Sequence, residues 1–123
     1  MNNSISKMSK EEELVVKLVE ILAKQNPNAE EKRQKALLRQ ALLTDDMITF
    51  INELKNAFSG YGKVSVETVK GAVEYVKASN EVQIRNSDCT DEQKDIMVKQ
   101  ETNRMTKVEV RILGSLAYLG LLK

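Results

Sequence analysis

The reactive side chains of this chain begin with a single thiol, Cys89, which stands between Asp88 and Thr90. Catalytic thiols act as thiolates and need positively charged surroundings, whereas a neighbouring carboxylate favours the protonated thiol. The 123 residues include no histidine, so Cys-His and Ser-His nucleophile pairs cannot form, and the commonest metal ligand is absent. We interpret Cys89 as a passive thiol and predict no metal site and no cofactor.

Carboxylates are the remaining candidates for acid-base chemistry. Asp45, Asp46, Asp88 and Asp91 form two short clusters. Both clusters lie at predicted helix starts, where capping and the positive end of the helix dipole already account for acidic residues. We therefore predict no catalytic residue and no enzymatic activity.

A basic stripe is the first candidate binding feature. Lys32, Lys35 and Arg39 fall within about 60° of one another on a predicted helix, at 100° per residue, and opposite its leucines. Such a stripe can contact phosphates or an acidic partner, and it is equally typical of the solvated back of an amphipathic helix. We favour the solvated back, expect charge reversal there to leave the fold intact, and keep the three residues as candidate partner-binding residues.

The carboxyl end is the second candidate, with the sequence Arg-Ile-Leu-Gly-Ser-Leu-Ala-Tyr-Leu-Gly-Leu-Leu-Lys over residues 111–123. It resembles the close of a recognition helix in winged helix-turn-helix DNA-binding domains. The resemblance places two helices over 91–99 and 106–119, with a turn between them. It implies nucleic-acid contact through one face that carries Arg104, Lys107, Arg111 and Ser115. Leu-Gly-Leu-Leu is also typical of a helix with a Schellman end.

The same segment has an alternative interpretation as a buried or shared helix. Its isoleucines and leucines spread around most of the helix rather than along one stripe, as in a helix that is central to a bundle or lies at a subunit interface. Leu113, Leu116 and Leu119 are the candidate core or interface residues. Gly114 suggests close packing, because a mid-helix glycine costs about 1 kcal/mol relative to alanine.

Composition indicates a single soluble helical domain. Hydrophobic residues make up 41%, charged residues 30% and aromatic residues 4%, with one proline and five glycines. So few turn-forming residues argue against an all-β chain and favour an aliphatic helical core. The domain is expected over residues 10–123, after a frayed or disordered tail at 1–9.

The net charge and the lengths of the apolar stretches limit where the protein can be located and which partners it can bind. The net charge of +1 gives no long-range attraction to nucleic acid or anionic membranes. The lone cysteine cannot form an internal disulfide, and no apolar stretch reaches the roughly 20 residues that span a bilayer. We expect a cytoplasmic protein without a membrane partner.

Capping patterns and periodicity place the first three helices. Ser9 with Glu12 begins the first helix, which ends at Asn26-Pro27, and Asn28 with Glu31 begins the second, which runs to about Leu43. The third is expected from Thr44 to the turn at 59–62, where Gly60 or Gly62 supplies the left-handed C-cap. Its predicted apolar stripe comprises Met47, Ile48, Ile51, Leu54 and Phe58.

The second half of the chain is predicted as two further helices. Ser65 caps a helix to about residue 78, although residues 64–69 also alternate like a strand, and Glu81–Arg85 is interpreted as helix end and loop. Thr90 and Gln93 form a capping box for the last helix, in which the polar residues 99–104 suggest a break. The sequence thus predicts an all-α bundle of four to five helices with the C-terminal helix central.

For function, we expect a small non-enzymatic regulator, adaptor or assembly factor. Its partner would be another protein or a second copy of the chain. The alternative is a helix-turn-helix DNA-binding regulator that uses the C-terminal helices.

Overall fold

The fold is all-α, as predicted. A computed structural model describes residues 10–26, 30–59 and 62–123, and these contain five helices. The helices are α2 (Lys10–Gln25), α3 (Glu31–Leu43), α4 (Met47–Ala57), α5 (Val66–Arg85) and α6 (Asp91–Tyr118).

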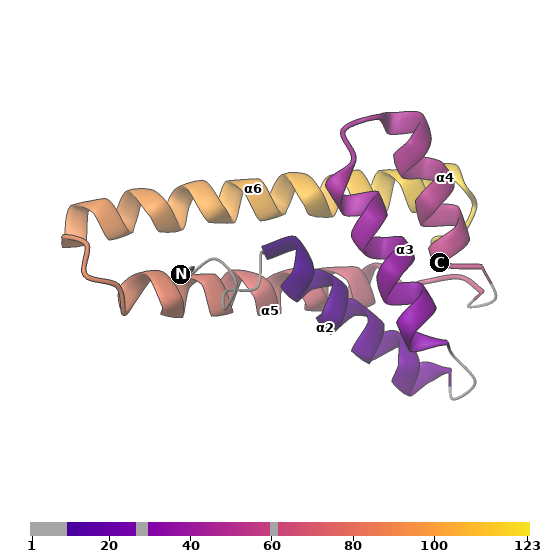
Figure 1. The fold of residues 1–123 in the computed structure, drawn as a ribbon, viewed down its shortest axis with the longest axis horizontal. Coiled ribbons are helices and arrows are strands. Elements are labelled where there is room, and N and C mark those ends of the chain that lie inside the picture. Colours follow the sequence, from indigo (N-terminus) through magenta and orange to yellow (C-terminus); the bar gives the residue numbers. More distant parts are fainter. Residues whose placement is uncertain (1–9, 27–29, 60–61) are drawn as a thin grey trace.

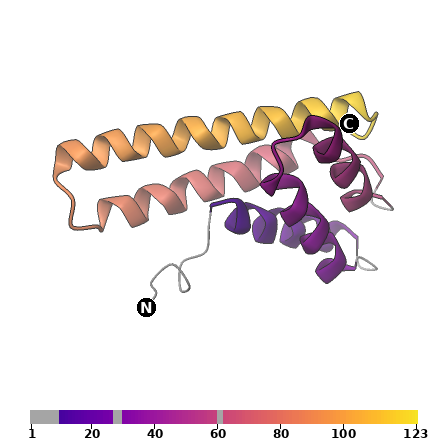
Figure 2. The same cartoon turned by 45° about the horizontal axis from the view of Figure 1, so that its top comes forward.

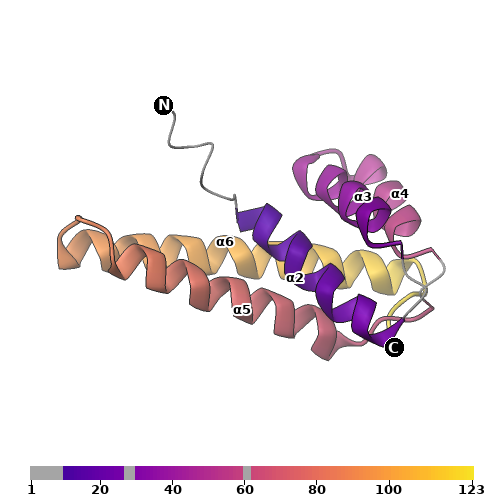
Figure 3. The same ribbon diagram turned by 60° about the horizontal axis from the view of Figure 1, so that its bottom comes forward.

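The architecture consists of a long hairpin with three shorter helices packed at one end. Helices α5 and α6 run antiparallel along each other (Figure 1). Helix α2 packs on α5 and α3, α3 pairs with α4, and α4 reaches α6. The closed end of the hairpin projects beyond the other helices in every view (Figures 2 and 3).

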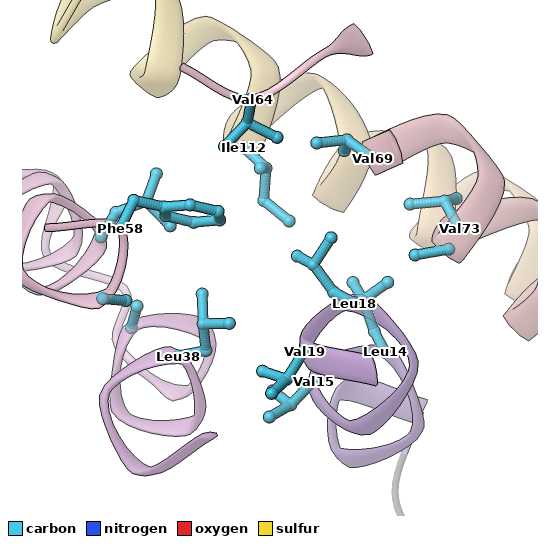
Figure 4. Packing of buried hydrophobic residues seen from close by; sticks show 14 of the residues in the cluster. Leu14, Val15, Leu18, Val19, Leu38, Phe58, Val64, Val69, Val73 and Ile112 are labelled. Atoms are coloured by element: carbon cyan, nitrogen blue, oxygen red, sulfur yellow. The ribbon is translucent and has the colours of Figure 1, made fainter. Parts of the chain in front are cut away.

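The core lies where α2, α3 and α4 meet the open half of the hairpin. Leu14, Val15, Leu18 and Val19 of α2 are all buried, because they recur at the spacing of one helix face. Figure 4 shows them facing side chains from the surrounding helices. The other labelled members of this cluster are Leu38, Phe58, Val64, Val69, Val73 and Ile112.

Two of the predicted helix starts are confirmed by their caps. The Ser65 hydroxyl accepts from the Thr68 amide at 3.1 Å. The Thr90 hydroxyl accepts from the Gln93 amide at 3.1 Å, and the Thr90 amide donates to the Gln93 side chain at 3.0 Å. Both caps satisfy amides that the first helical turn leaves unpaired. Ser9 and Asn28, the other predicted caps, lie outside the described residues.

The predicted break at residues 99–104 is wrong, because α6 continues unbroken from Asp91 to Tyr118. This segment is polar, but it contains neither glycine nor proline, and polarity alone does not interrupt a helix. The prediction of a helix end and loop at Glu81–Arg85 is also wrong. Helix α5 continues to Arg85, and its Ile84 is buried.

The prediction for the third helix is partly wrong. Helix α4 begins at Met47 rather than Thr44, and the Asp46 carboxylate caps it by accepting from the Thr49 amide at 2.8 Å. The predicted stripe is wrong at its beginning, because Met47 and Ile48 are exposed while Phe50 is buried, and correct at Leu54 and Phe58, which are buried. The helix ends at Ala57, and its C-cap residue Phe58 has φ of −99°, outside the left-handed region. Of the two predicted cap glycines, Gly60 lies outside the described residues and Gly62 has φ of 70° five residues after the helix end.

The loop before α5 resolves the ambiguity between strand and helix at 64–69. Val64 forms a parallel bridge with Leu122, in which the Val64 amide donates to Leu121 and the Lys123 amide donates to Val64. The helix begins two residues later, at Val66. Gly62 precedes the bridge with φ of 70°, a conformation that costs glycine little.

The end of α6 is a Schellman motif. Gly120 has φ of 73°, the Gly120 amide donates to the Ala117 carbonyl, and the Leu121 amide donates to the Leu116 carbonyl. These two bonds define the motif. The Leu-Gly-Leu-Leu sequence therefore serves here to end the helix and direct the chain back to Val64.

Candidate functional site

The basic stripe of α3 does not lie wholly in solvent. Arg39 faces α2, where its Nε and Nη2 atoms donate to the two carboxylate oxygens of Glu12, each at 2.5 Å. Lys32 is exposed and Lys35 is half-buried. Arg39 thus joins α3 to α2, whereas Lys32 remains exposed.

This ion pair changes the ionisation of both partners. The hydrogen bonds from Arg39 lower the pKa of Glu12 below its ordinary value, with further help from the charges of Arg39 and Lys35. The hydrogen bond to Glu12 raises the pKa of Arg39 in turn. A two-point guanidinium–carboxylate contact has defined geometry, and here it links α3 to α2 beside their apolar contact.

The predicted nucleic-acid face of α6 is turned largely towards the protein. Arg104 pairs with Glu11 of α2 and with Glu101. Arg111 donates to the Thr44 carbonyl at 2.7 Å. The two arginines therefore bind α2 and the α3–α4 turn to α6.

Further contacts on this face also point inward. The Arg111 guanidinium lies 3.9 Å from the centre of the Phe50 ring. Ser115 is buried, and its hydroxyl has no hydrogen-bond partner among the described residues. Lys107 is exposed. Together with the unbroken α6, this arrangement lacks the separate recognition helix of a helix-turn-helix.

The three candidate leucines of α6 differ in burial. Leu116 is fully buried in the core, Leu113 packs against its edge, and Leu119 is half-buried. Gly114 does not pack closely, since a Cβ built on it meets no atom within 4 Å. The prediction of close packing at Gly114 is therefore wrong for a single copy of the chain.

The candidate acid-base residues are not gathered into one site. Asp45 and Asp46 lie at the α3–α4 turn, where hydrogen bonds from the Thr49 side chain and amide lower the pKa of Asp46. Asp88 and Asp91 lie at the closed end of the hairpin, where Cys89 is half-buried. Within the described ranges, no group of three or more Cys, Asp or Glu side chains is arranged to hold a metal ion.

The closed end of the hairpin is the feature that sequence reasoning missed. We define the distal hairpin as residues 82–104, in which Ile84 is the only buried residue. Val82, Ile96 and Met97 are exposed there. Met97 and Ile84 line a groove of about 580 Å³, together with Arg104 and with Lys10 from the start of α2.

The distal hairpin is held in shape by polar contacts rather than by a core. Arg85 donates to Asp95 at 2.7 Å, and the Lys94 ammonium donates to the Arg85 carbonyl at 2.8 Å. The Thr90 cap closes the start of α6. The polarity of residues 99–104 therefore indicates exposure of this part of α6 rather than a break in the helix.

Comparisons with known proteins add no functional information. No protein-family model matches the chain, and searches of curated proteins and of solved structures gave no significant match. In the part of the chain that the structure describes, no helix is both long and apolar enough to cross a membrane.

Proposed function

We propose that this chain is a small non-enzymatic binding protein, a regulator, adaptor or assembly factor that contacts another macromolecule through its distal hairpin. The observation that carries the proposal is the poor burial of residues 82–104, where Ile84 alone is buried. The two helical segments of the distal hairpin bury little of their own surface within the chain, so contacts inside the chain do not account for their length. An exposed apolar surface on a stiff element accounts for it if a partner binds there.

The stiffness of the distal hairpin supports this role. Its closed end is ordered by the Thr90 cap, with the Arg85–Asp95 ion pair beside it. A surface that is already ordered loses little conformational entropy when a partner binds. Met97 lines the groove with Ile84 and is the more exposed of the two, so it is the apolar side chain that a docked partner would cover.

The test is capture of partners by the full chain, with variants on two surfaces. Met97→Asp should abolish capture, because a charge in the groove would have to be desolvated on binding. The double variant Lys32→Glu with Lys35→Glu is the matched control on α3, and it should capture as the wild type does. Thermal melts of both should match the wild type, because none of these side chains is in the core.

The opposite result would indicate that the binding surface lies on α3. If the α3 variant loses capture and Met97→Asp retains it, the partner binds the exposed lysines and the proposal for the distal hairpin is wrong. Treatment with nuclease distinguishes a protein partner from nucleic acid.

A further inference from the structure

Helix α2 covers only part of the hairpin, and it begins where the uncovered part of the hairpin begins. The Lys10 ammonium donates to Gln83 of α5 at 2.9 Å, and Glu11 pairs with Arg104 of α6. The closed end of the hairpin projects beyond this point (Figure 1). Because Lys10 also lines the groove of the distal hairpin, the segment that precedes Lys10 in the sequence is attached at the wall of this groove.

The charged side chains that line the groove are already paired. They are Lys10, Glu101 and Arg104. The Lys10 ammonium lies 3.7 Å from the Glu13 carboxylate, and Arg104 pairs with both Glu11 and Glu101. An occupant of the groove therefore needs no charge, and a charged group buried there would lose its hydration without gaining a free partner.

The remaining lining of the groove is apolar with neutral polar side chains beside it. Met97 is 37% exposed and Ile84 is 7% exposed, and Gln83 and Ser87 complete the lining. Small binding sites in proteins commonly combine apolar surface with a few neutral polar groups. The occupant that fits is a short segment that carries an apolar side chain among small neutral polar residues.

Residues 1–9 of the chain have this composition. Their sequence is Met-Asn-Asn-Ser-Ile-Ser-Lys-Met-Ser, in which Ile5 and Met8 stand among asparagine and serine. The segment contains no carboxylate, and Lys7 is its only charged side chain. A lysine can keep its ammonium in water at the rim of a groove while its neighbours bind inside.

The segment is long enough to reach the apolar part of the groove. Met97 stands seven residues before Arg104 in α6, a distance of about 10 Å along the helix, and Arg104 contacts Glu11. Met8 is three residues before Glu11 and Ile5 is six, and an extended chain covers about 10 Å and about 20 Å over these separations. Ile5 therefore reaches Met97 with chain to spare.

We propose that residues 1–9 bind in this groove, with Ile5 against Met97, and compete with the partner for it. The inference rests on the proposed function, because it places an internal competitor on the same surface. A tethered segment has an effective concentration in the millimolar range, so a small contact that would be negligible between separate molecules is populated here. The frayed tail predicted for residues 1–9 is then the state that a bound partner displaces.

The competition lowers the apparent affinity for the partner. When the groove is free for only a fraction of the time, the apparent Kd rises by the inverse of that fraction. An effective concentration of about 1–10 mM against a contact of about 1 mM leaves the groove free for roughly a tenth to a half of the time. Deletion of residues 2–9 should therefore strengthen capture of the partner by about two- to tenfold.

Disulfide trapping in the full chain tests the contact without a partner. In a Cys89→Ser background, Ser6→Cys with Ser87→Cys places one thiol beside Ile5 and the other in the lining of the groove. This pair should form an internal disulfide at least about tenfold faster than Ser6→Cys with Asn86→Cys, measured on non-reducing gels and by mass spectrometry. Asn86 is the matched control, because it adjoins Ser87, is more exposed and does not line the groove. Without binding, the more exposed thiol would react at least as fast.

A charge at residue 5 tests whether the apolar side chain drives the contact. Added to the Ser6→Cys, Ser87→Cys variant, Ile5→Asp should slow disulfide formation to the rate of the Asn86 pair, because its carboxylate would have to be desolvated in the groove. Asn3→Asp adds the same charge at a neutral polar position and should preserve the faster rate.

Equal rates for the Ser87 and Asn86 pairs, or a fast rate that survives Ile5→Asp, would overturn the inference. Unchanged capture after deletion of residues 2–9 would overturn the competition. The proposed function fails separately. If Met97→Asp retains capture while the Ser87 pair still forms faster, the partner binds elsewhere and the internal contact stands. If Met97→Asp loses capture and the two pairs react equally, the groove binds the partner without an internal competitor.

Discussion

Replacing Leu116 with alanine should strongly destabilise this protein. The Leu116 side chain is 0% exposed and belongs to the core cluster that α6 shares with α4 and α5. Truncation removes its buried methyl and methylene groups and leaves a cavity, a change that costs about 2–5 kcal/mol for a buried leucine. We expect a value towards the upper end of this range, because the Arg111–Thr44 hydrogen bond holds α6 against the α3–α4 turn and limits collapse of the helices around the cavity.

The loss expected for Leu116→Ala is a large share of the total free energy of unfolding. A domain of 123 residues has a stability of roughly 6–18 kcal/mol, at about 0.05–0.15 kcal/mol per residue. Each kcal/mol corresponds to a few degrees in Tm at this size, so Leu116→Ala should lower Tm by about 10 °C or more.

Urea unfolding followed by far-UV circular dichroism measures the effect directly. Leu43→Ala is the control, because Leu43 is an exposed helical leucine and its truncation should stay within about 0.5 kcal/mol. Equal losses for Leu116→Ala and Leu43→Ala, or a loss below about 1 kcal/mol at Leu116, would refute the position of α6 in the core.

Four other substitutions test smaller features. Because the folded-state pKa of Glu12 is lowered, its pair with Arg39 should stabilise the fold at neutral pH and lose that contribution as pH falls through this pKa. Glu12→Gln should flatten this part of a pH titration of stability. Among the described residues, the amide nitrogen and oxygen of buried Asn80 have no hydrogen-bond partner, so Asn80→Leu should raise the stability measured in urea by about 1–3 kcal/mol. In thermal melts, Gly71→Ala should stabilise by about 1 kcal/mol, while Gly120→Ala should destabilise because Gly120 has positive φ.

The candidate binding surfaces show where reasoning from the chain alone was limited. The spacing of Lys32, Lys35 and Arg39 correctly placed them near one side of a helix, and the same spacing could not reveal that α2 would present Glu12 to Arg39. The shared face of Arg104, Arg111 and Ser115 likewise follows from helix periodicity. Whether that face meets solvent or another helix is a property of packing, and here α2 and the α3–α4 turn cover it.

Local sequence determined the helices because their signals are local. A serine or threonine cap satisfies amides two or three residues away, and an apolar stripe repeats every three or four residues. The caps at Ser65 and Thr90 and the Schellman end at Gly120 could therefore be predicted. Tertiary structure alone decided that α6 runs unbroken along α5, that its first half projects from the core, and that Gly114 faces outward. These properties depend on which helix faces find partners, and that is set by contacts between residues far apart in the chain.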